Sequence, residues 1–102
     1  MAPLIEQNRD ALIALCKRYH VKTLEVFGSA TTDRFDPQTS DIDLLVEFDL
    51  DQVDSALLTY VGFRDAAAEL LGRPVDLASP DAIRNPYFRM GVDETRQPLY
   101  AA

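Results

Sequence analysis

The segment Asp41–Phe48, which reads DIDLLVEF, constrains the fold of this chain more than any other stretch. It begins with two aspartates and then becomes almost entirely apolar, as a central strand with both faces covered does. Because side chains in a strand alternate with a period of two, Asp41 and Asp43 are expected on the same face. The sequence therefore predicts a sheet whose central strand carries paired carboxylates near its start.

Two carboxylates this close repel each other unless a cation lies between them or one of them binds a proton. Oxygen ligands at this spacing suit a hard divalent ion such as Mg²⁺ or Mn²⁺. The alternative is that Asp41 only begins the strand and Asp43 faces solvent. An EF-hand calcium loop is excluded, because residues 36–43 lack its glycine and its distal glutamate.

Two further features can carry chemistry. Gly28-Ser29 follows a predicted strand directly, so its backbone N–H groups and the Ser29 hydroxyl can hold a phosphate, or the pair simply forms a turn. Asp76 lies within the short apolar run Pro74–Ala78, where aspartate is unusual, so it is exposed, paired or functional. If that run pairs with the DIDLLVEF strand, Asp76 joins Asp41 and Asp43 on one face.

The remaining elements follow from hydrophobic periodicity and turn signals. Helices are expected over residues 3–20, 52–71, 80–85 and 86–94, and strands over 23–27, 41–48, 74–78 and 98–100, with a polar loop over 28–40. Gly72 is the expected stop of helix 52–71, while residues 49–51 and Asp54 are expected to cap its start. This order predicts one domain over residues 1–102 of α/β (α+β) class, a small mixed β-sheet flanked by helices.

The composition narrows the possible partners and surroundings. The 102 residues carry 10 Lys and Arg against 17 Asp and Glu, so the net charge of −7 argues against direct nucleic-acid binding. No apolar stretch approaches the roughly 20 residues of a membrane span, and residues 1–10 lack the pattern of a signal peptide. The single Cys16 cannot form an internal disulfide, so a cytoplasmic protein is expected.

The order of these motifs carries a family resemblance. The matching residues are Phe27-Gly28-Ser29, Ser40–Val46 and Gly72–Leu77, and the segments Arg84-Asn85-Pro86 and Pro98-Leu99-Tyr100 are similar too. Over nearly its whole length the chain resembles the nucleotidyltransferase superfamily related to DNA polymerase beta, and within it the minimal nucleotidyltransferases. The resemblance implies the minimal nucleotidyltransferase fold.

The resemblance also implies a role for each candidate residue. Gly28 and Ser29 would hold the β- and γ-phosphates of ATP. Asp41 and Asp43 would bind two Mg²⁺ ions, with Mn²⁺ as a possible substitute. Asp76 would complete the shell of the second ion and help to remove the proton from the acceptor hydroxyl. The implied reaction transfers AMP and releases pyrophosphate.

The acceptor is expected in another protein, because larger relatives use a second domain to bind it and 102 residues leave no room for one. Minimal members are often paired with HEPN-domain proteins, which are frequently toxic RNases. The resemblance thus implies an antitoxin that assembles with a HEPN toxin and transfers AMP to one of its hydroxyls, for which tyrosine is the known type. Two alternatives stay open: a non-catalytic antitoxin that acts by binding, and a small-molecule nucleotidyltransferase of the aminoglycoside type.

Overall fold

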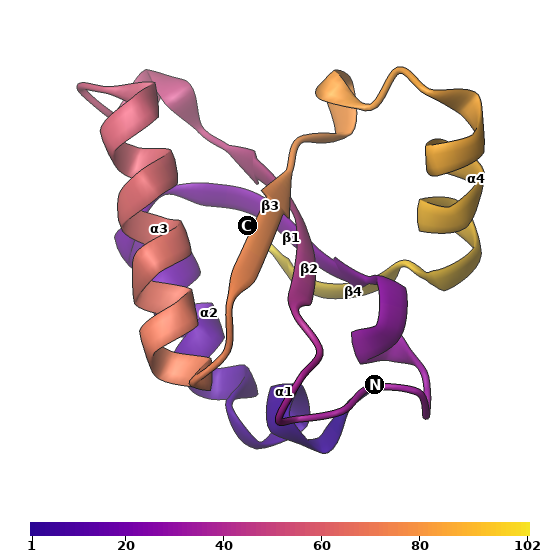
Figure 1. Cartoon of the computed structure of the whole chain (residues 1–102). Helices are drawn as coiled ribbons and strands as arrows, with labels where there is room; N and C mark the ends of the chain where they lie inside the picture. Colours follow the sequence, from indigo (N-terminus) through magenta and orange to yellow (C-terminus); the bar gives the residue numbers. More distant parts are fainter.

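A four-stranded sheet with the order β3-β2-β1-β4 forms the centre of the molecule (Figure 1). The computed structural model describes all residues, 1–102. The strands are β1 (Val21–Phe27), β2 (Ile42–Phe48), β3 (Val75–Ala78) and β4 (Gln97–Ala101). Strand β1 is antiparallel to both β2 and β4, whereas β2 is parallel to β3. This mixed sheet confirms the predicted fold class, and the four predicted strands are present with small shifts at their ends.

Helices cover both faces of the sheet. They are α1 (Pro3–Gln7), α2 (Arg9–Arg18), α3 (Ala56–Leu71) and α4 (Pro86–Thr95), with 3₁₀ turns η1 (Gly28–Thr31), η2 (Leu50–Gln52) and η3 (Pro80–Ala82). Helices α2 and α3 lie on one side of the sheet, and α4 lies on the other (Figure 1). None of these helices is both long enough and apolar enough to cross a membrane.

The alternation of side chains in β2 divides the core between the two faces. Ile42, Leu44 and Val46 belong to the larger cluster, which includes residues of α2 and α3 such as Leu12 and Phe63. Leu45 belongs instead to a smaller cluster with Phe27, Ile83 and Val92, the last of these from α4. Because Asp43 alternates with Ile42 and Leu44, it shares the face of Leu45, which α4 covers.

The predicted helix 3–20 is interrupted at Asn8. The Asn8 side-chain amide donates a hydrogen bond of 2.8 Å to the Leu4 carbonyl, and the Asn8 backbone lies at φ −108° and ψ 13°. Asparagine side chains compete in this way for backbone groups, which makes the residue a poor helix former. The chain therefore ends α1 and begins α2 at one residue, where the prediction had a continuous helix.

Two other helix boundaries differ from the prediction. Helix α3 begins at Ala56, and its cap is Ser55, whose hydroxyl accepts the Leu58 N–H, whereas residues 49–51 and Asp54 were expected there. The expected helix 80–85 is only the turn η3, because Ile83 is extended and buried in the smaller cluster. The Asn85-Pro86 pair then starts α4. Gly72 ends α3 as predicted, in the left-handed conformation.

Candidate active site

Asp43 and Asp76 are direct neighbours across the parallel pair β2–β3, where they occupy the same position in the register. Paired residues in a sheet project to the same face, so both carboxylates lie on the face that α4 covers. The register follows from burial, because Ile42 and Leu44 pair with Val75 and Leu77 and fill the opposite face. The pairing thus brings two acids 33 residues apart in the chain to one place on the sheet.

The surroundings of Asp43 disfavour its charged form. Partial burial raises the pKa of Asp43 to about 6, and the neighbouring carboxylates of Asp76 and Asp41 add to the effect. Removal of water and like charges both favour the protonated acid. A cation bound beside Asp43 would relieve both penalties, so the electrostatics of this position favour a positively charged ligand.

Asp41 is placed differently from the prediction. Strand β2 begins at Ile42, so Asp41 lies just outside the pleat that would direct its side chain. Its carboxylate lies 3.7 Å from the Arg73 guanidinium, and Arg73 Nε donates a hydrogen bond of 2.9 Å to the Ser40 carbonyl. Arg73 thus holds the start of β2 against the turn that leads into β3, with Asp41 half exposed beside it.

The Gly28-Ser29 turn lies against the Asp43 carboxylate. Gly28 has φ +73°, and a Cβ built on it would lie 2.5 Å from Asp43 Oδ2. The turn is braced by the hydroxyls of Thr31 and Thr32, which donate to the carbonyls of Gly28 and Ser29. Only a residue without a side chain fits this close approach at a positive φ.

The sequence predicts that the Gly28 N–H is available to bind phosphate, but in the structure this N–H already has a partner within the protein. It donates a hydrogen bond of 2.9 Å to Thr95 Oγ1, and the Thr95 hydroxyl donates to the Gly91 carbonyl within α4. A phosphate at this turn would therefore depend on the other groups of the turn, the Ser29 hydroxyl among them. The hydrogen bond also couples the end of α4 to the candidate site.

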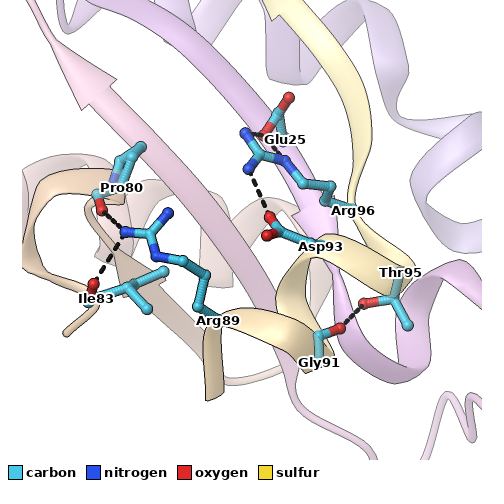
Figure 2. A network of polar contacts seen from close by, with 8 residues as sticks. All are labelled: Glu25, Pro80, Ile83, Arg89, Gly91, Asp93, Thr95 and Arg96. Atoms are coloured by element: carbon cyan, nitrogen blue, oxygen red, sulfur yellow. Dashed lines mark hydrogen bonds and ion pairs between the residues drawn. The ribbon is translucent and has the colours of Figure 1, made fainter. Parts of the chain in front are cut away.

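Two arginines fasten α4 over this face of the sheet (Figure 2). Arg89 donates to the carbonyls of Pro80 and Ile83 in and after η3, at 2.8 and 2.9 Å. Arg96, at the end of α4, donates to Glu25 of β1 and to Asp93. These contacts connect α4 to the η3 segment near its start and to β1 near its end.

A pocket of about 310 Å³ lies between α4 and the end of β1. Its walls combine Asp43 and the backbone of Gly28 with one face of α4, and it is lined by Phe27, Gly28, Asp43, Tyr87, Phe88, Gly91, Val92 and Thr95. Phe88 packs edge-on against Phe27, and Val92 is buried. Tyr87 as a whole residue is 82% exposed. The pocket is therefore acidic at one end and aromatic at the other.

The carboxylates of the candidate site have the chemistry to bind a hard divalent cation, but the three side chains do not yet converge on one metal position. Asp41, Asp43 and Asp76 offer only carboxylate oxygens, which Mg²⁺ and Mn²⁺ prefer. The structure contains no group of three or more His, Cys, Asp or Glu side chains arranged to hold a metal ion. Asp43 and Asp76 are paired already, and Asp41 would have to turn from Arg73 to join them.

Sequence reasoning does not find Arg73 or Thr95, which hold the start of β2 and the Gly28 turn. Phe88 packs against Phe27, whereas Tyr87 is exposed at the pocket. A weak signal for Arg73 is present in the sequence, because it is a cation in the turn directly before β3, the strand that contains Asp76. Thr95 carries none, because its partner Gly28 is 67 residues away in the chain.

Comparison with known proteins shows what the chain as a whole is similar to. Residues 9–98 match the family model described as a nucleotidyltransferase domain. A protein of Methanocaldococcus jannaschii, provisionally named a protein adenylyltransferase, is 38% identical over 80 residues, which are 78% of each chain. A solved structure described provisionally as a minimal nucleotidyltransferase superposes with a TM-score of 0.72 at 32% identity, over 93% of this chain and 92% of the other.

A second solved structure shares the fold at lower identity. It is described as a tri-AMPylated HEPN toxin of Shewanella oneidensis in complex with its MNT antitoxin, and it matches with a TM-score of 0.64 at 20% identity. The match covers 95% of this chain and 72% of the other. Because the family model spans most of the chain and the relative in Methanocaldococcus jannaschii exceeds 30% identity, the chain belongs to the nucleotidyltransferase domain family, as one of its minimal members.

Proposed function

We propose that this nucleotidyltransferase transfers AMP from ATP to a hydroxyl group of a partner protein, in a reaction that depends on Mg²⁺. The observation that carries the proposal is the pairing of Asp43 with Asp76 beside the Gly28 turn, with Asp41 at the start of the same strand. The M. jannaschii relative, provisionally named a protein adenylyltransferase, supports a protein as acceptor.

Each candidate residue has a proposed task. Asp41, Asp43 and Asp76 would hold Mg²⁺, which when bound neutralises the triphosphate, lowers the pKa of the attacking hydroxyl and favours in-line displacement. Ser29 and the backbone of the Gly28 turn would hold the β- and γ-phosphates. Asp41 has to leave Arg73 for this purpose, and Arg73 would keep the start of β2 in position meanwhile.

The proposed step is a single displacement at the α-phosphorus of ATP. The acceptor oxygen forms a bond to the α-phosphorus, the bond from that phosphorus to the bridging oxygen of pyrophosphate breaks, and pyrophosphate leaves with the electron pair. The proton of the acceptor hydroxyl passes to the Asp76 carboxylate, which acts as general base. Asp76 is exposed, so it can reach an acceptor that arrives from solvent.

We further propose that the partner is a HEPN-domain toxin and that its acceptor is a tyrosine hydroxyl, so that the chain acts as an antitoxin. The solved complex of an AMPylated HEPN toxin with an MNT antitoxin supports this partner. The net charge of −7 suits docking to a basic RNase.

The test is transfer of label from ATP to a purified HEPN partner. Label from [α-³²P]ATP should appear on the partner in the presence of Mg²⁺, whereas label from [γ-³²P]ATP should not. The variants Asp43→Ala and Asp76→Asn should lose the label, while Asp10→Asn, which changes an exposed acid on α2, should keep it. Equal labelling by wild type and Asp43→Ala would refute the proposed roles.

A second candidate, a non-catalytic antitoxin, is favoured by two observations. Members of the family commonly carry a basic residue directly after Gly-Ser, whereas here Ala30 to Asp33 read Ala-Thr-Thr-Asp. In addition, the three aspartates do not form a finished ligand set. This candidate predicts that the partner is bound and inhibited equally well by wild type and by Asp43→Ala, with no label transferred by either.

A further inference from the structure

Gly91 stands in the interior of α4, where glycine is costly for a helix. Its backbone does not need glycine, because its φ is not positive, and a Cβ there would meet no atom within 4 Å. Neither turn geometry nor tight packing within the chain therefore explains the residue. A side chain at position 91 would extend into open space.

That open space is the pocket beside Asp43. Tyr87, Gly91 and Thr95 are spaced four residues apart, so they form one face of α4, and all three line the pocket together with Gly28 and Asp43. Gly91 lies between the exposed ring of Tyr87 and the Thr95 hydroxyl that holds the Gly28 turn. A side chain at position 91 would fill the pocket between its aromatic and its acidic end.

The two ends of the pocket differ in what they can bind. The end at Asp43 and Gly28 belongs to the proposed metal and phosphate site. At the other end Phe88 is packed against Phe27, but the Tyr87 ring has no aromatic partner and the residue is 82% exposed. A free aromatic ring next to a gap offers a stacking surface to a planar group.

We propose that the Tyr87–Gly91–Thr95 face of α4 is the nucleoside subsite, in which the base stacks on Tyr87 and the absent side chain of Gly91 makes room for the nucleoside. This inference rests on the proposed function and adds where the nucleoside part of the substrate lies. The Thr95 hydroxyl already bonds Gly28 and Gly91, so on this face the base is recognised by stacking and shape.

The test compares binding of ATP with binding of inorganic tripolyphosphate, which lacks the nucleoside, to the full chain in Mg²⁺ by titration calorimetry. Gly91→Leu should weaken ATP binding at least about ten-fold and leave tripolyphosphate binding within about two-fold. Met90→Leu is the matched control, because it places leucine at the exposed neighbouring position outside the pocket, and it should bind both compounds like wild type.

A second pair of variants tests the ring itself. Tyr87→Ala should weaken ATP binding about ten-fold, as expected for loss of one base–aromatic stack, whereas Tyr87→Phe should stay within about two-fold. Because the Tyr87 ring is exposed, its removal leaves the core intact, so this pair decides the matter even where Gly91→Leu disturbs α4.

The outcomes separate this inference from the proposed function. Wild-type affinity for ATP in Gly91→Leu or in Tyr87→Ala would overturn the subsite while the proposed function stands. Equal loss of ATP and tripolyphosphate binding in Tyr87→Ala would also overturn it, because removal of a ring that stacks on the base should not affect a ligand without a nucleoside. If wild type binds neither compound and labels no partner, the proposed function fails and the subsite with it.

Discussion

Gly28 and Asp43 are packed so closely that a methyl group on the Gly28 α-carbon would lie 2.5 Å from Asp43 Oδ2. This contact joins the turn after β1 to the acidic residue of β2, which are adjacent antiparallel strands with Phe27 opposite Asp43. The backbone proposed to bind phosphate and the carboxylate proposed to bind metal therefore cannot move independently.

Gly28→Ala should destabilise the protein by about 2–3 kcal/mol, since both a positive φ and a clash with Asp43 oppose the new side chain. Gly72→Ala is the control, because Gly72 has a similar φ of +68° but open space around its Cβ, and it should cost only about 1 kcal/mol. Urea denaturation measures both. Equal costs would show that the Asp43 contact is unimportant.

Asp43→Asn should stabilise the apo protein near neutral pH by about 1–2 kcal/mol, a value reduced for partial exposure. The pKa of Asp43 is about 6 in the folded state, above the ordinary value near 3.9 for the unfolded chain. The folded state therefore holds the proton more tightly, and wild type loses stability as the pH rises from about 4 to about 6.

The measurement is denaturation of wild type and Asp43→Asn across that pH range. The two proteins should have similar stability at the acidic end, and the variant should gain its full advantage above about pH 6. Saturating Mg²⁺ should reduce this advantage if the ion binds beside Asp43 in wild type. A difference that does not change with pH would contradict the raised pKa.

Ser55→Ala should cost about 1 kcal/mol, because the Ser55 hydroxyl accepts the Leu58 N–H at the start of α3. Asp54→Ala should change stability little, since Asp54 forms no such cap. Thermal unfolding of the two variants distinguishes the observed cap from the one expected from the sequence. A larger loss in Asp54→Ala would reverse the assignment.

The Arg96–Glu25 pair should couple α4 to β1 by about 0.5–1.5 kcal/mol in a double-mutant cycle of Arg96→Met and Glu25→Gln. The two side chains are only partly exposed, and Arg96 Nε donates to Glu25 at 2.8 Å. Hydrogen exchange should show faster opening of α4 in Arg96→Met but unchanged protection in β2. Additive single effects would mean that the pair does not fasten the helix.

Cys16 should react with thiol reagents only after unfolding. The residue is buried in the core, and burial raises the pKa of its thiol to about 12, so the nucleophilic thiolate is scarce. Labelling with a chromogenic disulfide at about pH 8 should therefore be slow in buffer and rapid in denaturant. Rapid labelling in buffer would indicate that α2 opens easily.

Much of the fold is determined by local patterns of the sequence. The apolar run Leu44–Val46 and the alternation around Thr23–Phe27 identify β2 and β1, because hydrophobic periodicity reflects which side of one element is buried. The spacing of Asp41 and Asp43 on either side of the buried Ile42 can also be read from the local sequence. The boundary at Asn8 was missed, because one side-chain hydrogen bond to Leu4 outweighs the helical periodicity on both sides.

The assembled site depends on tertiary structure. Asp76 meets Asp43 only because β3 pairs with β2 in parallel and in one register, which burial of both strands against α3 determines. The hydrogen bond from Gly28 to Thr95 and the ion pair of Asp41 with Arg73 join residues far apart in the sequence, so they depend on how the whole chain folds. Residue types and short spacings thus decide which groups are present, whereas packing of distant segments decides which of them meet.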